Sequence, residues 1–192
     1  MNPTTSHSDP GPSPERAPRW LVGWTVAAIL MLGVGLGRPA LIEPDEGRNA
    51  AIAAEMARSG DLVVPRLEGL PYLDKPFLLF ALIAGSLELF GRSELAVRLP
   101  ALLSSWLTVA LVWWFGARVL GRRAGVIAAL ATATAPLFLA FARTAIFDAT
   151  LALLVAASLM GLFLAVEESA ETAARRRWIY GAWLAMGLGV LT

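Results

Sequence analysis

The sequence predicts an all-α fold, a polytopic bundle of transmembrane helices, from its composition and from the spacing of its apolar residues. Of the 192 residues, 57% are hydrophobic and only 16% are charged, whereas soluble domains have about a quarter of their residues charged. The apolar residues form runs of about 20, the number needed to cross a hydrocarbon core of about 30 Å. Short clusters of Arg, Glu, Pro and Gly separate these runs. The run lengths therefore exclude a single soluble domain.

Charge and residue content exclude several classes of function. The net charge is +1, so the sequence lacks the strong positive field of a nucleic-acid-binding protein, and we expect no nucleic-acid partner. The sequence has no Cys, which excludes disulfides, thiol catalysis and Cys-based metal sites. The one His, His7, lies in the N-terminal tail, so we expect no metal site built from His.

The chain divides into a tail, 1–18, and a membrane domain, 19–192. The tail is rich in Pro and Ser and has no apolar period, which predicts a disordered cytoplasmic segment. The apolar run that follows, 20–42, predicts an uncleaved membrane anchor. A cleaved signal peptide is the alternative, but the run is too long for one and no A-x-A-like cleavage site follows it.

The apolar runs predict five transmembrane spans, at 20–42, 95–120, 124–142, 147–166 and 178–192. The last run reaches the end of the sequence without a polar cap or a loop, so we expect this chain to be a fragment of a longer protein.

Arginines in the short loops predict the orientation, because Lys and Arg are enriched in cytoplasmic loops. They cluster in the tail and in the loops at 118–123 and 167–177, which we therefore place in the cytoplasm. Residues 43–94 and about 143–148 then lie on the outer side. We expect a multi-pass protein of the plasma (inner) membrane whose active side faces the exterior.

The outer loop, 43–94, predicts two helices that lie in the membrane interface, at 45–58 and 76–90. The run 76–90 would be about 22 Å long as a helix, too short for the hydrocarbon core, and it contains Glu88. A short tilted span is the alternative, but it would place the arginines of 118–123 outside, against the charge rule.

Acidic residues gather where the outer segments meet the membrane. Glu43, Asp45 and Glu46 follow the first span, and Asp45 is well placed to cap the helix at 45–58. A solvated loop with a helix cap explains this cluster without any chemistry, and that interpretation stays open.

The other ionisable residues of the outer side raise the same question. Asp74 and Lys75 precede the second interfacial helix, and Asp148, preceded by Arg143, begins another span. Ionisable groups at membrane depth are costly and need a partner or a function. Asp148 at a helix start gains from the helix dipole, so a purely structural role for it is equally open.

Several motifs keep a fixed order along 43–192: D-E-x-R-x-A-x-I-A-x-E-M, then S-G-D-x-x-V-P-R-L, then Y-x-x-K-P, then F-G-x-S-E-x-A-V-R-L-P, then G-R-R-A-G and A-R-T-A-x-x-D. This order resembles the polytopic glycosyltransferases with the GT-C fold, of the protein O-mannosyltransferase and aminoarabinose (lipid A) transferase type. The resemblance implies a sugar donor carried on a polyprenyl phosphate and a lipid, glycan or protein acceptor.

The resemblance also implies roles for single residues. Asp45 matches the first acid of the family's Asp-Glu pair, the catalytic carboxylate, Glu46 is its neighbour, and Asp148 matches a second outer acid. The resemblance therefore implies a catalytic set of Asp45, Glu46 and Asp148. Lys75 matches the Lys that faces the phosphate of the lipid donor. Asp74 stands where many members have Glu, which keeps the charge and shortens the reach.

Two more departures from the family pattern leave every charge in place. Phe77 stands where members usually have a second Pro after Lys-Pro, and Gly47 stands where many have Pro. Gly47 loosens the first turn of the helix.

The mechanism implied by the resemblance has Asp45 as the general base on the acceptor hydroxyl and Lys75 as a point charge on the leaving phosphate. A single attack would invert the anomeric centre, by analogy with inverting glycosidases. Asp74, Asp148 and Arg143 could contact the sugar or a divalent cation with oxygen ligands, and metal use stays open.

Two other functions compete with glycosyl transfer. A transporter would need polar residues or helix breaks within the spans, and Thr132, Thr134 and Pro136 form such a cluster. Contacts between packed helices explain the two Thr residues more simply. The second rival is a non-catalytic membrane fragment.

Overall fold

The computed structural model describes residues 17–169 and 172–192, so most of the predicted tail lies outside the described residues. The described part is helical apart from one antiparallel hairpin of two short strands, which confirms the all-α class. In chain order its elements are α1 (Arg19–Gly33), α2 (Asp45–Ser59), β1 (Arg66–Leu67), β2 (Leu70–Pro71), α3 (Leu78–Phe90), α4 (Glu94–Val119), α5 (Arg122–Thr134), α6 (Pro136–Ala142), α7 (Phe147–Glu167) and α8 (Ala173–Val190).

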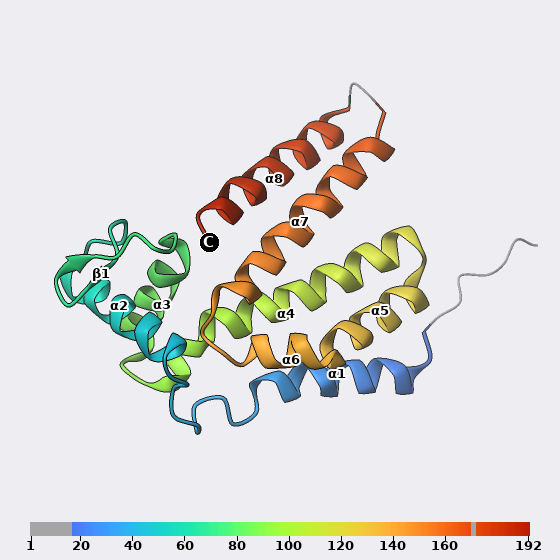
Figure 1. Ribbon diagram of the computed structural model, residues 1–192. Helices are drawn as coiled ribbons and strands as arrows, with labels where there is room; N and C mark the ends of the chain where they lie inside the picture. The colour runs from blue at the N-terminus through green and yellow to red at the C-terminus, as the bar shows by residue number, and fades with distance from the viewer. Residues whose placement is uncertain (1–16, 170–171) are drawn as a thin grey trace, which may run out of the picture.

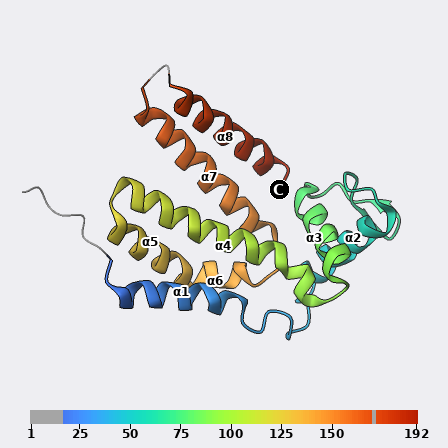
Figure 2. The same cartoon turned by 180° about the vertical axis from the view of Figure 1, so that it is seen from behind.

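The helices form an elongated bundle with a small lobe at one end (Figure 1). The lobe consists of α2, the β hairpin and α3, and the bundle consists of α1 and α4 to α8. Helix α4 is central, since it contacts α1, α3, α5, α6 and α7. The view from behind shows α7 and α8 as an antiparallel hairpin that leans away from α1 (Figure 2).

Two helices, α4 and α7, are long and apolar enough to cross a membrane. The pair α5 and α6 also qualifies if it is counted as one span, although its two parts are bent by 67°. Helices α1 and α3 are apolar but shorter, and α3 is the helix for which the sequence predicts an interfacial position at 76–90.

The predicted span at 20–42 is helical over α1 alone, and the backbone from 34 to 44 is irregular. Glycine weakens a helix by about 1 kcal/mol relative to Ala. Three glycines occupy alternate positions here, Gly33, Gly35 and Gly37, and Gly35 lies in the left-handed region at φ 69°. Pro39 further disfavours continuation of the helix.

The predicted span at 124–142 is broken at Ala135, which is extended and precedes Pro136. Proline clashes with a helical conformation of the preceding residue and lacks an N–H, so the helix ends there and α6 begins in a new direction. At the end of the chain, α8 begins at Ala173 rather than near the predicted 178, because Thr172 caps it by accepting a hydrogen bond from the Arg175 backbone N–H.

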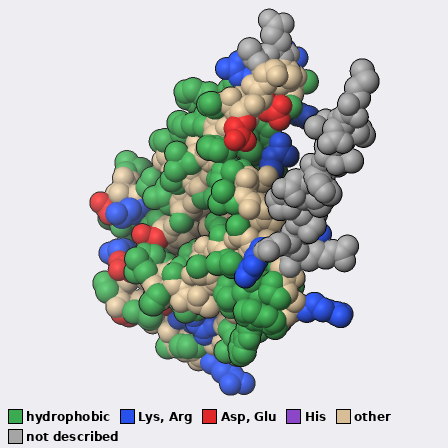
Figure 3. Space-filling model, turned by 90° about the vertical axis from the view of Figure 1, so that its right-hand side faces the viewer, with side chains coloured by type: hydrophobic (Ala, Val, Ile, Leu, Met, Phe, Trp, Pro, Cys, Tyr) green, Lys and Arg blue, Asp and Glu red, His purple; other side chains and the backbone are tan. Residues whose placement is uncertain are grey.

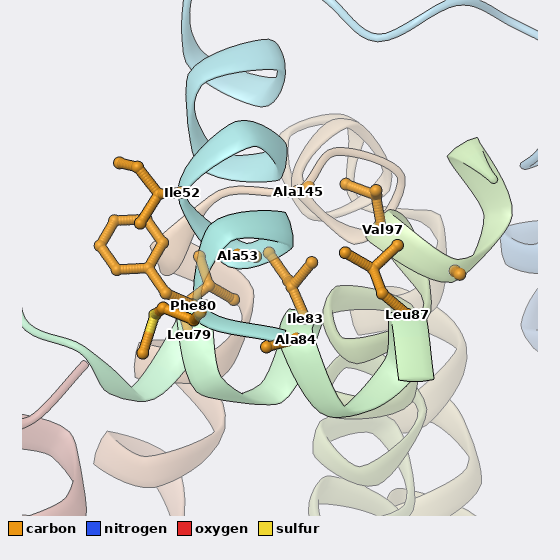
Figure 4. Close-up of a cluster of buried hydrophobic side chains, with 11 residues drawn as sticks. Ile52, Ala53, Leu79, Phe80, Ile83, Ala84, Leu87, Val97 and Ala145 are labelled. Atoms are coloured by element: carbon orange, nitrogen blue, oxygen red, sulfur yellow. The ribbon is translucent and has the colours of Figure 1, made fainter. Parts of the chain in front are cut away.

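The lobe is held to the bundle by an apolar core shared by α2, α3 and α4 (Figure 4). Ile52 and Ala53 of α2 lie over Phe80 and Ile83 of α3, and Val97 of α4 closes one side of the cluster. All five side chains are less than 5% exposed. Burial of this core fixes the start of α2 relative to α4, which positions the polar groups described below.

Helices α4 and α5 approach closely at a pair of glycines, and this contact generates the first prediction. A Cβ on Gly125 would lie 2.6 Å from both the Trp113 backbone oxygen and the Ala117 backbone nitrogen. Neither backbone atom can move without shifting α4. We expect Gly125→Ala to destabilise the protein by about 1–3 kcal/mol, the usual cost of overpacking, as measured by the thermal unfolding midpoint in detergent.

The matched control is Gly23→Ala in α1, where an added Cβ meets no atom within 4 Å. This change should leave the midpoint unchanged or raise it, because Ala favours a helix more than Gly does. Equal midpoints for the two variants would show that the α4–α5 contact is looser than described.

Candidate functional site

Polar groups converge at the start of α2, where the lobe meets the bundle. Asp45 is the first residue of α2, and 64% of its side chain is exposed. The Arg48 guanidinium donates a hydrogen bond to the Asp45 Oδ1 at 2.6 Å. Asp45 therefore presents a carboxylate that is held from one side and open to solvent on the other.

Glu46, the next residue, is in the opposite environment, with only 1% of its surface exposed. Its Oε1 accepts hydrogen bonds from the Arg98 Nε at 2.9 Å and the Ala145 backbone N–H at 2.7 Å. Its Oε2 accepts from an Arg98 NH2 proton at 2.8 Å and the Ile42 backbone N–H at 2.9 Å. These four donors fill the usual acceptor positions of a carboxylate.

The ionised form of Glu46 is favoured despite its burial. Burial raises the pKa of this carboxyl group, but the hydrogen bonds from Arg98, Ile42 and Ala145 outweigh it and hold the pKa below its usual value of 4.5. A lowered pKa means that the contribution of Glu46 to stability is present above the usual value and is lost as the pH falls through the lowered one. Glu46 therefore stays charged at neutral pH.

Arg98, in the first turns of α4, is 2% exposed and uses all five of its N–H donors. Two of them bind Glu46. The other three bind backbone oxygens of Leu36, Pro39 and Ala40 at 2.8 to 2.9 Å. One guanidinium therefore joins α4, the start of α2 and the irregular segment 34–44.

This geometry changes the role expected for Glu46. The sequence predicts a place for it in the catalytic set, but its acceptor positions are occupied by protein donors and its side chain is buried. No position remains for an acceptor hydroxyl. Glu46 is instead the group that fixes Asp45, its neighbour in the chain, at the surface.

Arg143 also departs from its predicted contact with the sugar or a cation. Its NH1 and NH2 groups donate to the backbone oxygens of Met31, Leu32 and Val34, at 2.8 to 3.2 Å. These carbonyls lie at the end of α1, where helix carbonyls lack partners within the helix. Arg143 therefore caps α1 and has a structural role here.

Sequence reasoning missed Asn49, which ties the segment before α7 to α2. Its side-chain amide donates to the Ala145 backbone oxygen at 2.9 Å, while the N–H of Ala145 bonds Glu46. Asp148 follows three residues later, in the first turn of α7, and is exposed. The two bonds at Ala145 thus bring the start of α7 to the same end of the molecule as Asp45.

A row of aromatic rings places the remaining polar residues at this end. The Tyr72 ring packs edge-on against Phe80 at 6.2 Å, and Phe80 packs edge-on against Phe147 at 5.3 Å. The Tyr72 hydroxyl donates to Asp74 Oδ2 at 3.2 Å. Since Asp148 follows Phe147 directly, the row links Asp74 to the start of α7.

The charged residues at the start of α2 also influence Tyr72. Burial and the hydrogen bond to Asp74 raise the pKa of Tyr72, and the negative charges of Asp74 and Asp45 add to this, while the Arg48 charge opposes it. Lys75 follows Asp74, is exposed, and forms no ion pair with another described residue. Asp45, Asp74, Lys75 and Asp148 therefore share one end of the molecule.

Two further observations bear on this end. A Cβ on Gly47 would collide with the Glu43 carboxylate, so the absence of a side chain at this position lets Glu43 fold over the first turn of α2. Among the described residues, no group of three or more His, Cys, Asp or Glu side chains is arranged to hold a metal ion.

Comparison with known proteins gives the family. The family described as "Dolichyl-phosphate-mannose-protein mannosyltransferase" matches residues 74–192. The undecaprenyl phosphate-alpha-4-amino-4-deoxy-L-arabinose arabinosyl transferase of Edwardsiella ictaluri is 33% identical over 176 residues, which are 90% of this chain and 32% of that protein. The enzyme of the same name from Aeromonas salmonicida is 30% identical over the same shares of the two chains.

Solved structures agree with the sequence comparison. Crystal structures of ArnT from Cupriavidus metallidurans superpose with a TM-score of 0.81 in the apo state and 0.85 bound to undecaprenyl phosphate, each at 34% identity. The matches cover 91% and 92% of this chain, and 32% and 33% of ArnT. The chain thus spans about a third of the length of its relatives. It belongs to the dolichyl-phosphate-mannose-protein mannosyltransferase family, which confirms the resemblance seen in its motifs.

Proposed function

We propose that this chain forms part of a membrane glycosyltransferase that moves a sugar from a polyprenyl-phosphate donor to a lipid, glycan or protein acceptor on the non-cytoplasmic face. The observation that carries the proposal is the arrangement around Asp45, an exposed carboxylate fixed by the buried Glu46–Arg98 pair. The relatives named as arabinosyl transferases of undecaprenyl phosphate, and the ArnT structure bound to that lipid, support the donor class.

The polar end of the molecule has the groups that such a transfer needs. Asp45 takes the proton from the acceptor hydroxyl as the hydroxyl oxygen attacks C1 of the sugar. The bond between C1 and the phosphate oxygen breaks, its electrons stay on the phosphate, and the Lys75 ammonium neutralises that charge. A single displacement inverts the anomeric centre, by analogy with inverting glycosidases.

The other acidic residues suit contacts with the sugar. Asp74 accepts one hydrogen bond from Tyr72, which orients the carboxylate and leaves its second oxygen for a sugar hydroxyl. Asp148 is exposed at the start of α7 and forms no ion pair with a described residue. Both residues are proposed as sugar contacts.

The predicted orientation in the inner membrane fits this assignment. The end of α4 and the start of α5, which carry Arg118, Arg122 and Arg123, lie at the end of the bundle opposite the lobe, and the start of α8, with its run of arginines at 175–177, also lies away from the lobe (Figure 1). With the arginines in the cytoplasm, the lobe with Asp45 lies at the outer membrane surface. A polyprenyl-phosphate donor could then keep its tail in the bilayer while its phosphate reaches Lys75.

The rival transporter interpretation loses its main support. The helix break at Pro136 exists, but Thr132 and Thr134 donate their hydroxyls to the backbone oxygens of Ala128 and Leu130, four residues earlier in their own helix. These hydroxyls are satisfied locally, so they offer no polar path through the bundle.

Replacement of Asp45 tests the base directly. Asp45→Asn in the full-length protein should lower kcat by about 10²- to 10⁴-fold, the usual contribution of a general base, while thermal stability stays near that of the wild type. Sugar transfer from a synthetic polyprenyl-phosphate donor, followed by mass spectrometry, measures the effect. Glu88→Gln, an exposed acid on α3, is the matched control and should keep full activity. Normal turnover by Asp45→Asn would remove Asp45 from the mechanism.

Replacement of Lys75 tests donor binding. Lys75→Ala should raise KM for the donor by about 10- to 100-fold, since a hydrogen bond to a charged group contributes about 1.5–3 kcal/mol, and should leave KM for the acceptor unchanged. Lys75→Arg keeps the charge and should recover part of the loss. An equal rise in both KM values would argue against a contact between Lys75 and the phosphate.

Replacement of Arg98 tests whether the buried pair positions Asp45. Arg98→Leu leaves the Glu46 charge buried and unpaired, which should cost about 3–5 kcal/mol of stability and also lower sugar transfer. Arg118→Leu, which breaks the more exposed pair with Glu168 at 3.6 Å, should cost less than about 1 kcal/mol. The thermal unfolding midpoints of the two variants measure this difference in stability. Equal midpoints would contradict a structural role for the buried pair.

A further inference from the structure

A groove of about 480 Å³ lies between α1, α4 and α5, in the part of the bundle away from the lobe. This volume is within the range of about 300–1,000 Å³ that is usual for ligand sites. Apolar side chains form most of its wall. The one hydroxyl there, on Thr25, donates to the Leu21 backbone oxygen at 2.9 Å and so turns away from the groove. The lining residues are Ala17, Val22, Thr25, Val26, Ile29, Val109, Ala110, Trp113, Arg122, Val126 and Ala129.

Helix α1 forms one wall of the groove. The α1 residues that line it run from Val22 to Ile29, which corresponds to roughly 10 Å of helix at 1.5 Å per residue. Val22, Val26 and Trp113 are between 42% and 49% exposed although they line it. Large apolar side chains with this exposure leave the groove open on one side.

A positively charged side chain lies at one end of the groove. Arg122, the first residue of α5, lines it, is exposed, and forms no ion pair with another described residue. Its neighbour Arg118 differs, because it pairs with Glu168. The space-filling view of this end of the molecule shows Lys and Arg side chains scattered around a largely hydrophobic surface (Figure 3).

Tryptophan side chains indicate that this end of the bundle lies at the depth of the lipid headgroups. Trp is enriched where membrane helices meet the membrane–water interface. Trp20 and Trp24 are both 66% exposed near the start of α1. Trp113 and Trp114 lie near the end of α4, and Trp114 packs on Trp178 of α8 with ring centres 5.6 Å apart. Arg122 therefore lies at the depth where a lipid phosphate would be.

We propose that this groove binds one acyl chain of an anionic phospholipid from the adjacent leaflet, with the lipid's negatively charged headgroup paired to Arg122. The apolar walls favour binding of the acyl chain. The Arg122 guanidinium, which forms no ion pair with another described residue, favours a negatively charged headgroup. Basic pockets between transmembrane helices are known to bind anionic headgroups. This site is independent of the proposed glycosyl transfer, because it lies between different helix faces and away from the lobe.

Native mass spectrometry of the full-length protein tests the proposal. The delipidated protein is titrated with phosphatidylglycerol and, separately, with phosphatidylethanolamine of the same acyl chains. The wild type should bind phosphatidylglycerol more tightly. Arg122→Gln should weaken phosphatidylglycerol binding about five-fold, the factor expected for one Arg beside an anionic lipid surface, and leave phosphatidylethanolamine binding unchanged.

Two pairs of variants separate the groove from the rest of the surface. Ala110→Phe fills the groove from an exposed position of α4 and should weaken binding of both lipids, whereas Leu103→Phe, exposed elsewhere on α4, should not. Arg177→Gln, an exposed Arg of α8 outside the groove, controls for charge. Equal binding of the two lipids by the wild type would overturn the proposal. Insensitivity to both Arg122→Gln and Ala110→Phe would also overturn it, as expected if another helix of the full protein occupies the groove.

Discussion

The buried pair of Glu46 and Arg98 is the interaction on which the outer end of the molecule depends. Each charge alone would cost several kcal/mol to remove from water, and a buried pair stabilises only if its remaining donors and acceptors are satisfied. Here every N–H of Arg98 and every usual acceptor position of Glu46 has a partner. The pair therefore connects α2, α4 and the segments before α2 and α7 into one unit.

The same pair explains how two adjacent acids come to differ. Glu46 faces inward, bonded on all sides, and its charge is structural. Asp45, one residue earlier, projects from the first turn of α2 into solvent and is bound by Arg48. Environment, and not residue type, separates the buried carboxylate that fixes the backbone from the one that is open to solvent. Because Glu46 is held rigidly, the neighbouring Asp45 is held in a defined position.

At this end of the molecule, the sequence predicts the helices better than the long-range hydrogen bonds that join them. The segments predicted at 45–58 and 76–90 correspond to α2 and α3, because apolar patterns and a terminating glycine such as Gly60 are local signals. The predicted cap by Asp45 is wrong, since Asp45 is the first residue of α2 and the N-cap, Pro44, makes no side-chain hydrogen bond. Two partners of Glu46, Arg98 and Ala145, lie 52 and 99 residues away, and the partners of Arg143 lie 109 to 112 residues away, so no local pattern gives these pairings. One signal was present: Arg98 is the sole charge between Leu95 and Ala117 in a long apolar run, and a lone charge at that depth needs a partner.

The irregular segment between α1 and α2 shows why two arginines are needed. Helix α1 ends at Gly33, so the last carbonyls of the helix and those that follow it have no partners further along the helix, and close to a membrane water cannot be relied upon to satisfy them. Arg143 binds three of these oxygens and Arg98 binds three more. Because arginine carries several donors in a fixed plane, a single side chain can satisfy several carbonyls of a bent backbone. The early end of α1 is therefore stabilised by distant parts of the chain, and the bent segment after it leads to Asp45, at the same end of the molecule as Lys75 and Asp148.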